Sequence, residues 1–568
     1  MFEQTDHFPV IFKFSCLINQ VETLKIDNMT QAQTSTASRN VSELVTHIDK
    51  LTQEIQELYC LDDVPWVVGY SGGKDSTAVL QLIWNAIAIL PQEKRTKKIY
   101  VITTDTLVEN PIVTSWVNHS LEKMRDSAKQ QNLPIEPHLL TPELKYMFWT
   151  NLIGKGYPSP RRGFRWCTER LKIRPTNHFI RNVIRVSGKV LLILGTRKAE
   201  SKTRAATMAK YEATKVDDLL NSDSNLSNYL RYSDTLPNAL IYSPIQEWRD
   251  DEVWLYLMQY KNAWGHSNQD LFTMYRGATE DNECPLVVDT STPSCGDSRF
   301  GCWVCTMVNQ DKSMEAMIQN DEEKEWLQPL LEIRNELDVQ NDDDRRDFRR
   351  LWGNVQLFER KNKDKKSIVP VPGPYTKKWR EYWLRKVLEA QVQVRENAPQ
   401  EFKDISLITS EELSEIRRIW LEEKHEFDDS LPKIYQEVTG EVFQDMRKEA
   451  NENKILGEDE WEVLQEVCDD DVMHLELMTK LLDTERQFYT KSRRVGIYES
   501  LTKCFDSSSL SQDKAIEKAH QKRDIMSAAI EGDVKLVKEK IAQLNKKEAK
   551  QTQQLTWGSI KFGNRDNS

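Results

Sequence analysis

The sequence lacks any long apolar run. The best candidate, residues 79–90, is interrupted by Gln81 and Asn85 and falls short of the ~20 apolar residues that a helix needs to cross a bilayer. Residues 8–18 are apolar, but no basic segment precedes them and no clear cleavage site follows, so we expect no secretion signal. These absences predict a cytoplasmic protein without a membrane partner. Met29 is an alternative start that would remove the first 28 residues.

Cysteine is sparse, and positive charge is in deficit. Nine cysteines scattered over 568 residues exclude a disulfide scaffold, so cysteines that cluster are expected to bind metal or to react. Lys and Arg total 78 against 89 Asp and Glu, which gives a net charge of −11. This balance excludes a uniformly basic nucleic-acid coat but allows local basic patches.

Short apolar runs alternate with helical patterns over the first half of the chain. Residues 66–69, 99–103 and 190–194 are typical of buried strands, and the segments between them have helical spacing. This alternation predicts an α/β fold with a mostly parallel sheet flanked by helices. The expected organisation is a leader and N-terminal helix at 1–60, an α/β nucleotide-binding domain at 61–260, a cysteine-rich region with a basic segment at 261–375, a helical domain at 376–545 and a flexible tail at 546–568.

A glycine-rich loop follows the first of these strands. The sequence from 67 to 77 reads VVGYSGGKDST, a strand, a tight turn and the start of a helix. Glycines let backbone N–H groups approach an anion, and the helix N-terminus adds its dipole. We expect a phosphate cradle, with an ordinary strand–turn–helix as the alternative. Its members would be Ser71, Gly72, Gly73, Lys74 and Ser76. The Walker A spacing is absent, because Asp75 follows the lysine.

The SGGKDS loop resembles the PP-loop of the superfamily of N-type ATP pyrophosphatases and phosphoadenylylsulfate reductases. Three further segments match in order: TDT with Asp105, GTRKAES with Arg197 followed by Arg204, and PIQEW followed by VW at 253–254. The resemblance implies an adenine nucleotide alpha hydrolase-like fold, with Arg197 and Arg204 as phosphate contacts. Its ligand crevice is expected beyond the carboxyl ends of the strands.

A basic motif with one cysteine lies between these segments. RRGFRWCTERLK at 161–172 resembles the R-x-C-x-x-x-L-K segment of the superfamily, and residues 155–174 hold seven Lys and Arg against one Glu. This charge suits a polyphosphate or a nucleic-acid backbone, and a solvated loop is the alternative. A cysteine among arginines is expected to have a lowered pKa, so Cys167 is a candidate reactive thiolate; a buried structural thiol is the alternative.

Four cysteines fall within 22 residues further on. They are Cys284, Cys295, Cys302 and Cys305. Four thiolates satisfy either a [4Fe–4S] cluster or a tetrahedral Zn²⁺ ion, and spacing alone does not distinguish them. The sulfur-related resemblance favours the iron–sulfur cluster, with Zn²⁺ as the alternative.

Residues 345–380 form a second basic stretch, with 12 Lys and Arg against three Asp and Glu and with aromatic residues interleaved. Such a composition can neutralise phosphates and stack on bases. An exposed helix with buried aromatics, or a surface for a partner protein, is the alternative.

Taken together, the loop, Cys167, the four cysteines and the helical extension resemble the DndC family of DNA phosphorothioation sulfurtransferases. The resemblance implies an ATP pyrophosphatase that replaces a non-bridging oxygen of the DNA backbone by sulfur. It also implies an iron–sulfur cluster, a cysteine desulfurase partner (DndA or an equivalent), the partners DndD and DndE, and DNA as substrate. On this interpretation Lys74 faces the ATP phosphates, Asp75 or Asp105 positions Mg²⁺, and Cys167 carries sulfur.

Two other enzymes remain open at this stage. A phosphoadenylylsulfate-reductase-like enzyme would act on a small sulfonucleotide and leave about 300 residues without a role. A tRNA-thiolating enzyme would use the same loop on RNA.

Overall fold

The computed structural model describes residues 39–161, 163–200, 230–233, 235–278, 300–350, 353–362, 365–447, 458–468, 471–489, 493–508 and 511–543. The chain divides into two compact units. The first comprises residues 1–148, 160–338 and 390–407, and the second comprises residues 149–159, 339–389 and 408–568.

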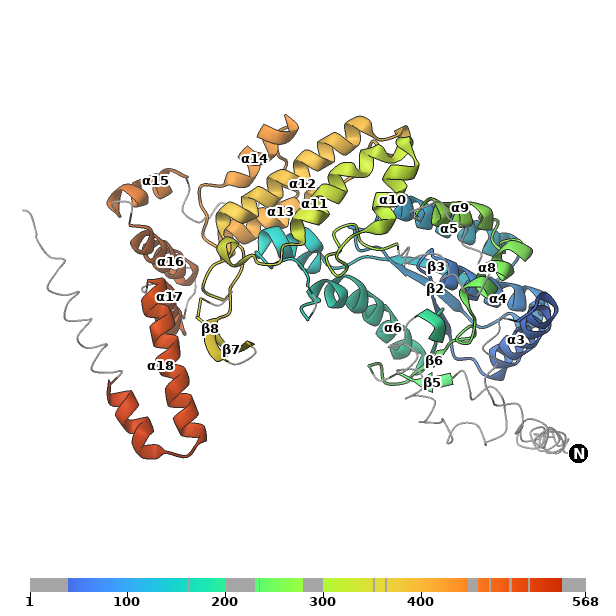
Figure 1. The fold of residues 1–568 in the computed structure, drawn as a ribbon, viewed down its shortest axis with the longest axis horizontal. Helices are drawn as coiled ribbons and strands as arrows, with labels where there is room; N and C mark the ends of the chain where they lie inside the picture. Colours follow the sequence, from blue (N-terminus) through green and yellow to red (C-terminus); the bar gives the residue numbers. More distant parts are fainter. Residues whose placement is uncertain are drawn as a thin grey trace, which may run out of the picture. The chain divides into compact units, whose positions relative to one another are not determined.

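A six-stranded sheet forms the centre of the first unit (Figure 1). Its order is β3-β2-β1-β4-β6-β5, and every neighbouring pair is parallel except β5 with β6. The strands are β1 (Trp66–Gly69), β2 (Ile99–Thr104), β3 (Ile135–Leu140), β4 (Val190–Ile193), β5 (Leu230–Tyr232) and β6 (Ala239–Tyr242). The expected α/β fold with a mostly parallel sheet is confirmed.

Helices cover both faces of the sheet. Successive side chains of a strand point to opposite faces, so each face has apolar residues that pack against helices. Val68 and Val101 belong to a core with α3 (Val41–Leu61), α4 (Lys74–Ile89), α5 (Pro111–Gln130), α8 (Asp250–Gln259) and α9 (Asn268–Gly277). Val67 and Leu192 belong to a second core on the other face, with α6 (Arg174–Ser187). Figure 1 shows α6 across the sheet from α4 and α8.

Two further helices of the first unit follow the sheet along the chain. They are α10 (Lys312–Asn320) and α11 (Gln328–Leu337). Arg334 on α11 is buried and donates to the carbonyl oxygen of Cys305 at 3.0 Å. This contact fixes the backbone of a segment that carries two of the candidate metal ligands.

The second unit is mainly helical, as expected for the C-terminal region. Its helices are α13 (Ser410–Arg418), α14 (Ser430–Thr439), α15 (Glu458–Val467), α16 (Val472–Tyr489), α17 (Ile497–Ser508) and α18 (Gln512–Ile530). The helix α12 (Lys377–Asn397) has residues in both units. The second unit also contains an antiparallel hairpin, β7 (Leu357–Asn362) with β8 (Lys365–Pro370). The hairpin occupies part of the basic stretch for which an exposed helix was the alternative prediction.

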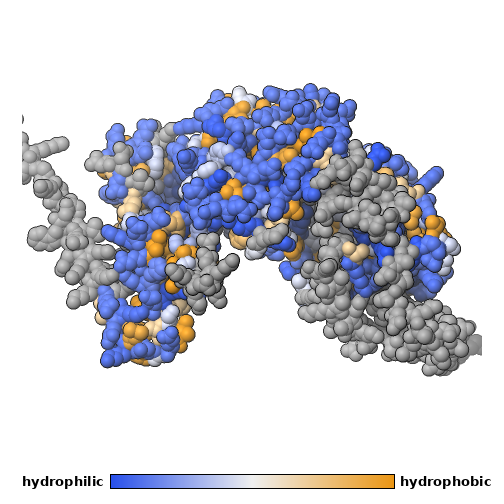
Figure 2. All heavy atoms as spheres, viewed as in Figure 1, coloured by the Kyte–Doolittle hydropathy of each residue, from blue (hydrophilic) through white to orange (hydrophobic). Residues whose placement is uncertain are grey.

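Hydrophilic residues predominate on the face drawn in Figure 2, where hydrophobic residues occur in scattered patches. Within the described part of the chain, no helix is long and apolar enough to cross a membrane.

Candidate functional site

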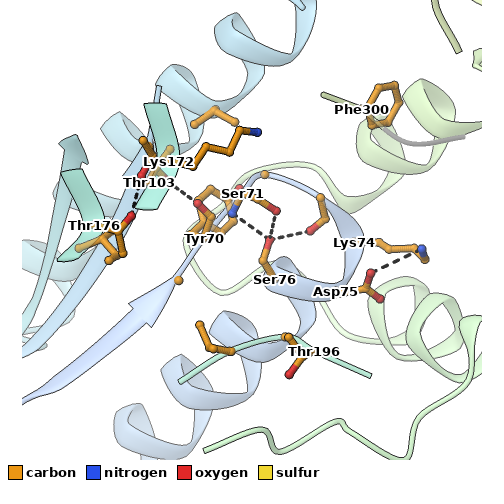
Figure 3. A pocket seen from close by; sticks show the side chains of 18 of the residues that line it. Tyr70, Ser71, Lys74, Asp75, Ser76, Thr103, Lys172, Thr176, Thr196 and Phe300 are labelled. Atoms are coloured by element: carbon orange, nitrogen blue, oxygen red, sulfur yellow. Dashed lines mark hydrogen bonds and ion pairs between the residues drawn. The ribbon is translucent and has the colours of Figure 1, made fainter. Parts of the chain in front are cut away.

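The glycine-rich loop joins β1 to α4 and is held by one serine. The Ser76 hydroxyl lies 3.1 Å from both the amide nitrogen and the hydroxyl of Ser71, and it donates to the carbonyl oxygen of Gly73 at 3.0 Å (Figure 3). Gly72 has φ +75°, and a Cβ there would lie 2.4 Å from the Val117 side chain. The turn therefore requires glycine at this position.

Neighbouring elements fix the loop from outside. Trp116 on α5 donates its indole N–H to the Gly72 carbonyl at 3.2 Å, and Thr103 on β2 donates its hydroxyl to the Tyr70 carbonyl at 2.6 Å. The Tyr275 hydroxyl on α9 accepts the amide N–H of Lys74 at 3.3 Å. The first amide of α4, a group that binds anions at helix N-termini, is thus occupied by a phenol oxygen.

The loop opens into a cavity of about 1020 Å³. This volume lies at the upper end of the range for small-molecule pockets. Its wall includes the loop, the carboxyl ends of β2 and β4, and the aromatic side chains of Trp254, Tyr275 and Phe300. Two cations, Lys74 and Lys172, flank the loop in Figure 3. The cavity can therefore receive an anionic nucleotide between two ammonium groups.

Lys74 belongs to a compact charge network. Its Nζ lies 3.6 Å from Asp75 and 3.3 Å from Asp250. Burial alone would lower the pKa of Lys74, but Tyr275 and the two carboxylates raise it above its ordinary value. The Lys74 side chain is therefore a stable cation at the cavity wall.

Arg197 organises this network from below the cavity surface. Its side chain is only 1% exposed, and it donates to Asp75 at 2.7 Å, to Asp250 at 2.5 Å and to the Trp248 carbonyl at 3.1 Å. The donors described for Arg197 thus face protein oxygens rather than a free phosphate site. The structure places Arg197 as a support for the two carboxylates, and Arg204 lies outside the described residues.

Asp105 also lines the cavity, just after β2. Its carboxylate accepts the Leu107 amide at 2.8 Å, and burial raises its pKa, with nearby Glu109 adding to the rise. Glu109 accepts the Thr106 hydroxyl at 3.0 Å and pairs with Lys172 at 3.1 Å. Asp75 and Asp105 both line the cavity, so each can offer oxygen ligands to Mg²⁺.

Two of the four clustered cysteines lie beside this wall. Backbone hydrogen bonds pair residues 301–303 with residues 108–110, from Trp303 to Val108 at 2.9 Å and from Asn110 to Gly301 at 3.3 Å. The Cys302 sulfur consequently lies 3.5 Å from the Glu109 carboxylate and 3.4 Å from the Thr106 hydroxyl. Glu109 therefore contacts the Cys302 thiol and also lines the cavity, together with its ion-pair partner Lys172.

Cys167 does not have the environment that its neighbouring arginines suggest. Burial raises its pKa, and the nearby Cys305 thiol raises it further. The expectation of a lowered pKa is wrong because desolvation disfavours the thiolate, and the Arg side chains do not counter it. Cys167 also lies close enough to Cys305 for their charges to interact, although 138 positions separate them in the sequence.

Two of the four candidate metal ligands, Cys302 and Cys305, lie among the described residues. Cys284 and Cys295 fall outside the described residues, and the described part of the chain holds no group of three or more His, Cys, Asp or Glu side chains placed to hold a metal. Cys302 and Cys305 adopt a compact turn, with the Cys305 amide donating to the Cys302 carbonyl at 3.0 Å. Two soft thiols on such a turn fit either an iron–sulfur cluster or Zn²⁺.

The arginines at the start of the second basic stretch are used internally. Arg346 donates to the carbonyls of Gly373 and Pro372, Arg350 also donates to Pro372, and Arg349 pairs with Asp347 and Glu476. Arg345 stacks on Trp379 at 4.1 Å. These side chains hold the second unit together, so the sequence overstates the charge available to a nucleic acid here.

Sequence reasoning missed three residues that shape the site: Trp116, Asp250 and Tyr275. Asp250 follows the matched PIQEW segment by two positions, and this proximity was the available signal. Trp116 and Tyr275 lie within helices of ordinary composition. Only the tertiary structure brings their polar atoms to the loop.

Comparison with known proteins supports a superfamily for this site. Residues 65–264 match the family model described as the phosphoadenosine phosphosulfate reductase domain. This segment contains the loop, Asp105, Cys167 and Arg197, and the match supports an enzyme of the PP-loop superfamily.

Two individual proteins are similar over part of the chain. An uncharacterized protein of Methanocaldococcus jannaschii is 28% identical over 197 residues, which cover 35% of this chain. The chain spans about a third of the length of that relative (32%). The crystal structure of FMN adenylyltransferase from Candida glabrata, in complex with FAD and inorganic pyrophosphate, is similar with a TM-score of 0.22 and 10% identity, covering 51% of this chain and 77% of that one.

Proposed function

We propose that this chain is the sulfurtransferase of DNA phosphorothioation. It would use ATP to activate a backbone phosphate and place sulfur where a non-bridging oxygen was. The observation that carries the proposal is a polyphosphate cradle whose wall adjoins a group of thiols, Cys302 beside the wall and Cys305 close to Cys167. Glu109 and Lys172 line the nucleotide cavity, and Glu109 also lies 3.5 Å from the Cys302 sulfur.

The cradle supports ATP as the activating substrate. A phosphodiester oxygen is a poor leaving group, so it has to be converted into a better one. Attack of this oxygen on the α-phosphorus of ATP forms a P–O bond and releases pyrophosphate. Lys74 and the loop amides would stabilise the charge on the departing pyrophosphate. Asp75 or Asp105 would hold Mg²⁺, which neutralises phosphate charge.

Sulfur transfer then completes the exchange. The terminal sulfur of a cysteine persulfide attacks the activated phosphorus, and AMP leaves with the original oxygen. A thiol reductant cleaves the resulting S–S bond, which leaves the phosphorothioate on DNA and a disulfide between the carrier cysteine and the reductant. We assign the carrier role to Cys167, with a cysteine desulfurase as the sulfur source and DndD and DndE as further partners.

The four cysteines are assigned to a [4Fe–4S] cluster held by Cys284, Cys295, Cys302 and Cys305, with Zn²⁺ as the alternative. A bound metal centre would tie its loop to the fold. Arg197 is assigned to positioning Asp75 and Asp250. The network distances around Lys74 support this assignment.

Mass spectrometry of nuclease-digested DNA tests the function. Cells that contain the partners should yield phosphorothioate dinucleotides with the wild-type gene and with Lys94→Ala, an exposed lysine outside the cavity. Lys74→Ala should yield none. Absence of phosphorothioate in the wild-type strain would refute the proposal, and gene-dependent sulfur in tRNA would establish the tRNA-thiolating alternative.

The match to the phosphoadenosine phosphosulfate reductase domain favours a second candidate, reduction of a small sulfonucleotide. Purified protein with a thiol reductant should then release sulfite from phosphoadenylylsulfate. Sulfite release without DNA modification would replace the first proposal by this one.

A further inference from the structure

The helix α6 and the π-helical turn before it, Thr168–Ile173, carry a concentration of positive charge. Residues 170–189 contain six Lys and Arg and no Asp or Glu, in a chain of net charge −11. The segment itself supplies no carboxylate to offset this charge, and Lys172 and Arg174 form ion pairs with carboxylates outside it, Glu109 and Glu169. The segment therefore attracts polyanions more strongly than a mixed surface does.

The charge is confined to one face of α6. Phe179, Ile180, Val183 and Ile184 pack into the core beneath the sheet. On the opposite side, a stripe of exposed basic residues follows the spacing i, i+4, i+7 and i+11. This basic stripe consists of Arg174, His178, Arg181 and Arg185, and exposed Lys189 follows just beyond the end of the helix.

Most of the stripe is not neutralised by the protein itself. Arg174 pairs with Glu169 at 3.3 Å, and both side chains are about half exposed. Arg181, Arg185 and Lys189 have no carboxylate within 4 Å in the described part of the chain. They differ in this respect from Arg346 and Arg349, whose guanidinium groups form hydrogen bonds and ion pairs within the second unit.

The stripe begins at the nucleotide cavity. Lys172, Thr176 and Asn177, from the same turn and helix, line the cavity wall, and Figure 3 shows Lys172 and Thr176 beside the loop. Arg174 and Arg185 are ~16 Å apart along the helix axis, a length over which one DNA strand rises by about five nucleotides along the duplex axis. A backbone lying on the stripe would thus have one end at the cavity.

We propose that the outer face of α6 binds the phosphate backbone of DNA and leads it to the nucleotide cavity. The proposal rests on the proposed function and adds to it the surface that the substrate occupies. Its warrant is the basic stripe next to the cavity, in which Arg181 and Arg185 have no carboxylate within 4 Å among the described residues (Figure 1 shows α6 in teal). The proposal therefore places the DNA contact on α6 instead of on the arginines at 345–350.

Binding of a fluorescent DNA duplex of about 20 base pairs tests the proposal with full-length protein. Arg181→Gln/Arg185→Gln should raise Kd about tenfold at ~0.1 M salt and make the log Kd against log salt slope shallower by about 1–2. The matched control, Arg125→Gln/Lys129→Gln, removes the same charge from exposed positions on α5 and should stay within about twofold of wild type.

Equal effects of the two double variants would overturn the proposal, because net charge alone would then explain binding. An unchanged slope in the α6 variant would overturn it as well. Arg181→Lys/Arg185→Lys keeps the charge and should bind DNA like wild type. This variant provides a second test if the glutamine variant misfolds, because weakened DNA binding by the folded lysine variant would contradict the proposal. Loss of tRNA binding with intact DNA binding would assign the stripe to RNA and contradict the proposal.

The binding assay uses unmodified duplex and needs no sulfur transfer. A failure of the proposed function would therefore appear as absent phosphorothioate with stripe-dependent DNA binding intact. A failure of the present inference would appear as phosphorothioate formation by the Arg181→Gln/Arg185→Gln protein at the wild-type level.

Discussion

A buried arginine sets the charges at the cavity wall. Arg197 is almost fully buried and holds Asp75 and Asp250, and these carboxylates in turn hold Lys74. Each side chain in the network has a charged partner, which is the condition under which buried charge is tolerated. The position of Lys74 therefore depends on Arg197, which holds both of its carboxylate partners.

Asp250→Asn tests this dependence. The change removes one charged partner from buried Arg197 and from Lys74, so we expect a loss of about 1–2 kcal/mol in stability. We also expect about tenfold lower kcat/KM for ATP, because Lys74 loses its fixed position. Melting temperature and pyrophosphate release measure the two effects. Asp126→Asn, with the same charge change at an exposed site on α5, is the control, and equal behaviour of the two variants would contradict the positioning role.

At the scale of elements, the loop works because α4 and α5 approach closely. Gly72 combines a positive φ with a Cβ position that Val117 already occupies. A second close approach is that of Gly195, whose Cβ would lie 2.9 Å from the Asp75 backbone. Both glycines allow the chain segments around the cradle to meet.

Gly72→Ala should abolish pyrophosphate release, since the loop has to move to relieve the 2.4 Å contact. The control is Gly188→Ala at the end of α6, where φ is +76° and nothing lies within 4 Å of the Cβ position. Both variants carry backbone strain of about 1–2 kcal/mol, but only Gly72→Ala adds a clash at the cradle. If both enzymes keep wild-type activity, the described loop geometry is not the active one.

The packing of α3 against the sheet includes a pH-sensitive contact. Glu54 accepts the Tyr242 hydroxyl at 2.8 Å, and burial raises the pKa of Glu54 from 4.5 to about 7. Between these values the folded state binds more protons than the unfolded state, so stability falls as pH rises from 4.5 to 7. The total change is on the order of 3 kcal/mol.

Glu54→Gln keeps a hydrogen-bond acceptor and removes the ionisation. Its melting temperature should therefore fall less than that of the wild type between pH 5 and pH 8. Thermal unfolding at several pH values measures the difference. A wild-type curve that stays parallel to the variant curve would show that Glu54 ionises normally in the folded protein.

At the scale of the whole molecule, the sequence was most informative where chemistry and local structure coincide. The strands at 66–69, 99–103 and 190–194, the loop and the superfamily could be predicted because apolar runs and glycine turns are local signals. The helix after the loop starts at Lys74, with Gly73 as its N-cap.

Long-range pairing could not be predicted. Residues 108–110 meet residues 301–303 across almost 200 positions, and no local pattern marks this contact. The arginines at 345–350, at the start of the second basic stretch, were misleading for a similar reason. Charge composition does not reveal that Asp347 and Glu476 already pair with Arg349.

The assignment of the four cysteines makes a prediction about the whole protein. Anaerobically purified protein should be brown and contain about four iron and four acid-labile sulfide per chain. Cys302→Ser should lower both contents and the melting temperature, since the site would no longer tie its loop to the fold. Cys60→Ser, at an exposed position on α3, should change neither. Stoichiometric zinc without sulfide would establish the zinc alternative.

The central claim is that the cavity at the PP-loop cleaves ATP between the α- and β-phosphates. Its most direct test is the product pattern of ATP labelled at the α-phosphate, incubated with duplex DNA, a cysteine desulfurase with cysteine, and a thiol reductant, in the presence of wild-type protein, Lys74→Ala or the Lys94→Ala control. The account predicts labelled AMP and pyrophosphate from wild type and control, and at least a hundredfold less from folded Lys74→Ala, a loss of ~3 kcal/mol in transition-state stabilisation. Release of ADP and inorganic phosphate, or undiminished pyrophosphate release by folded Lys74→Ala, would contradict it.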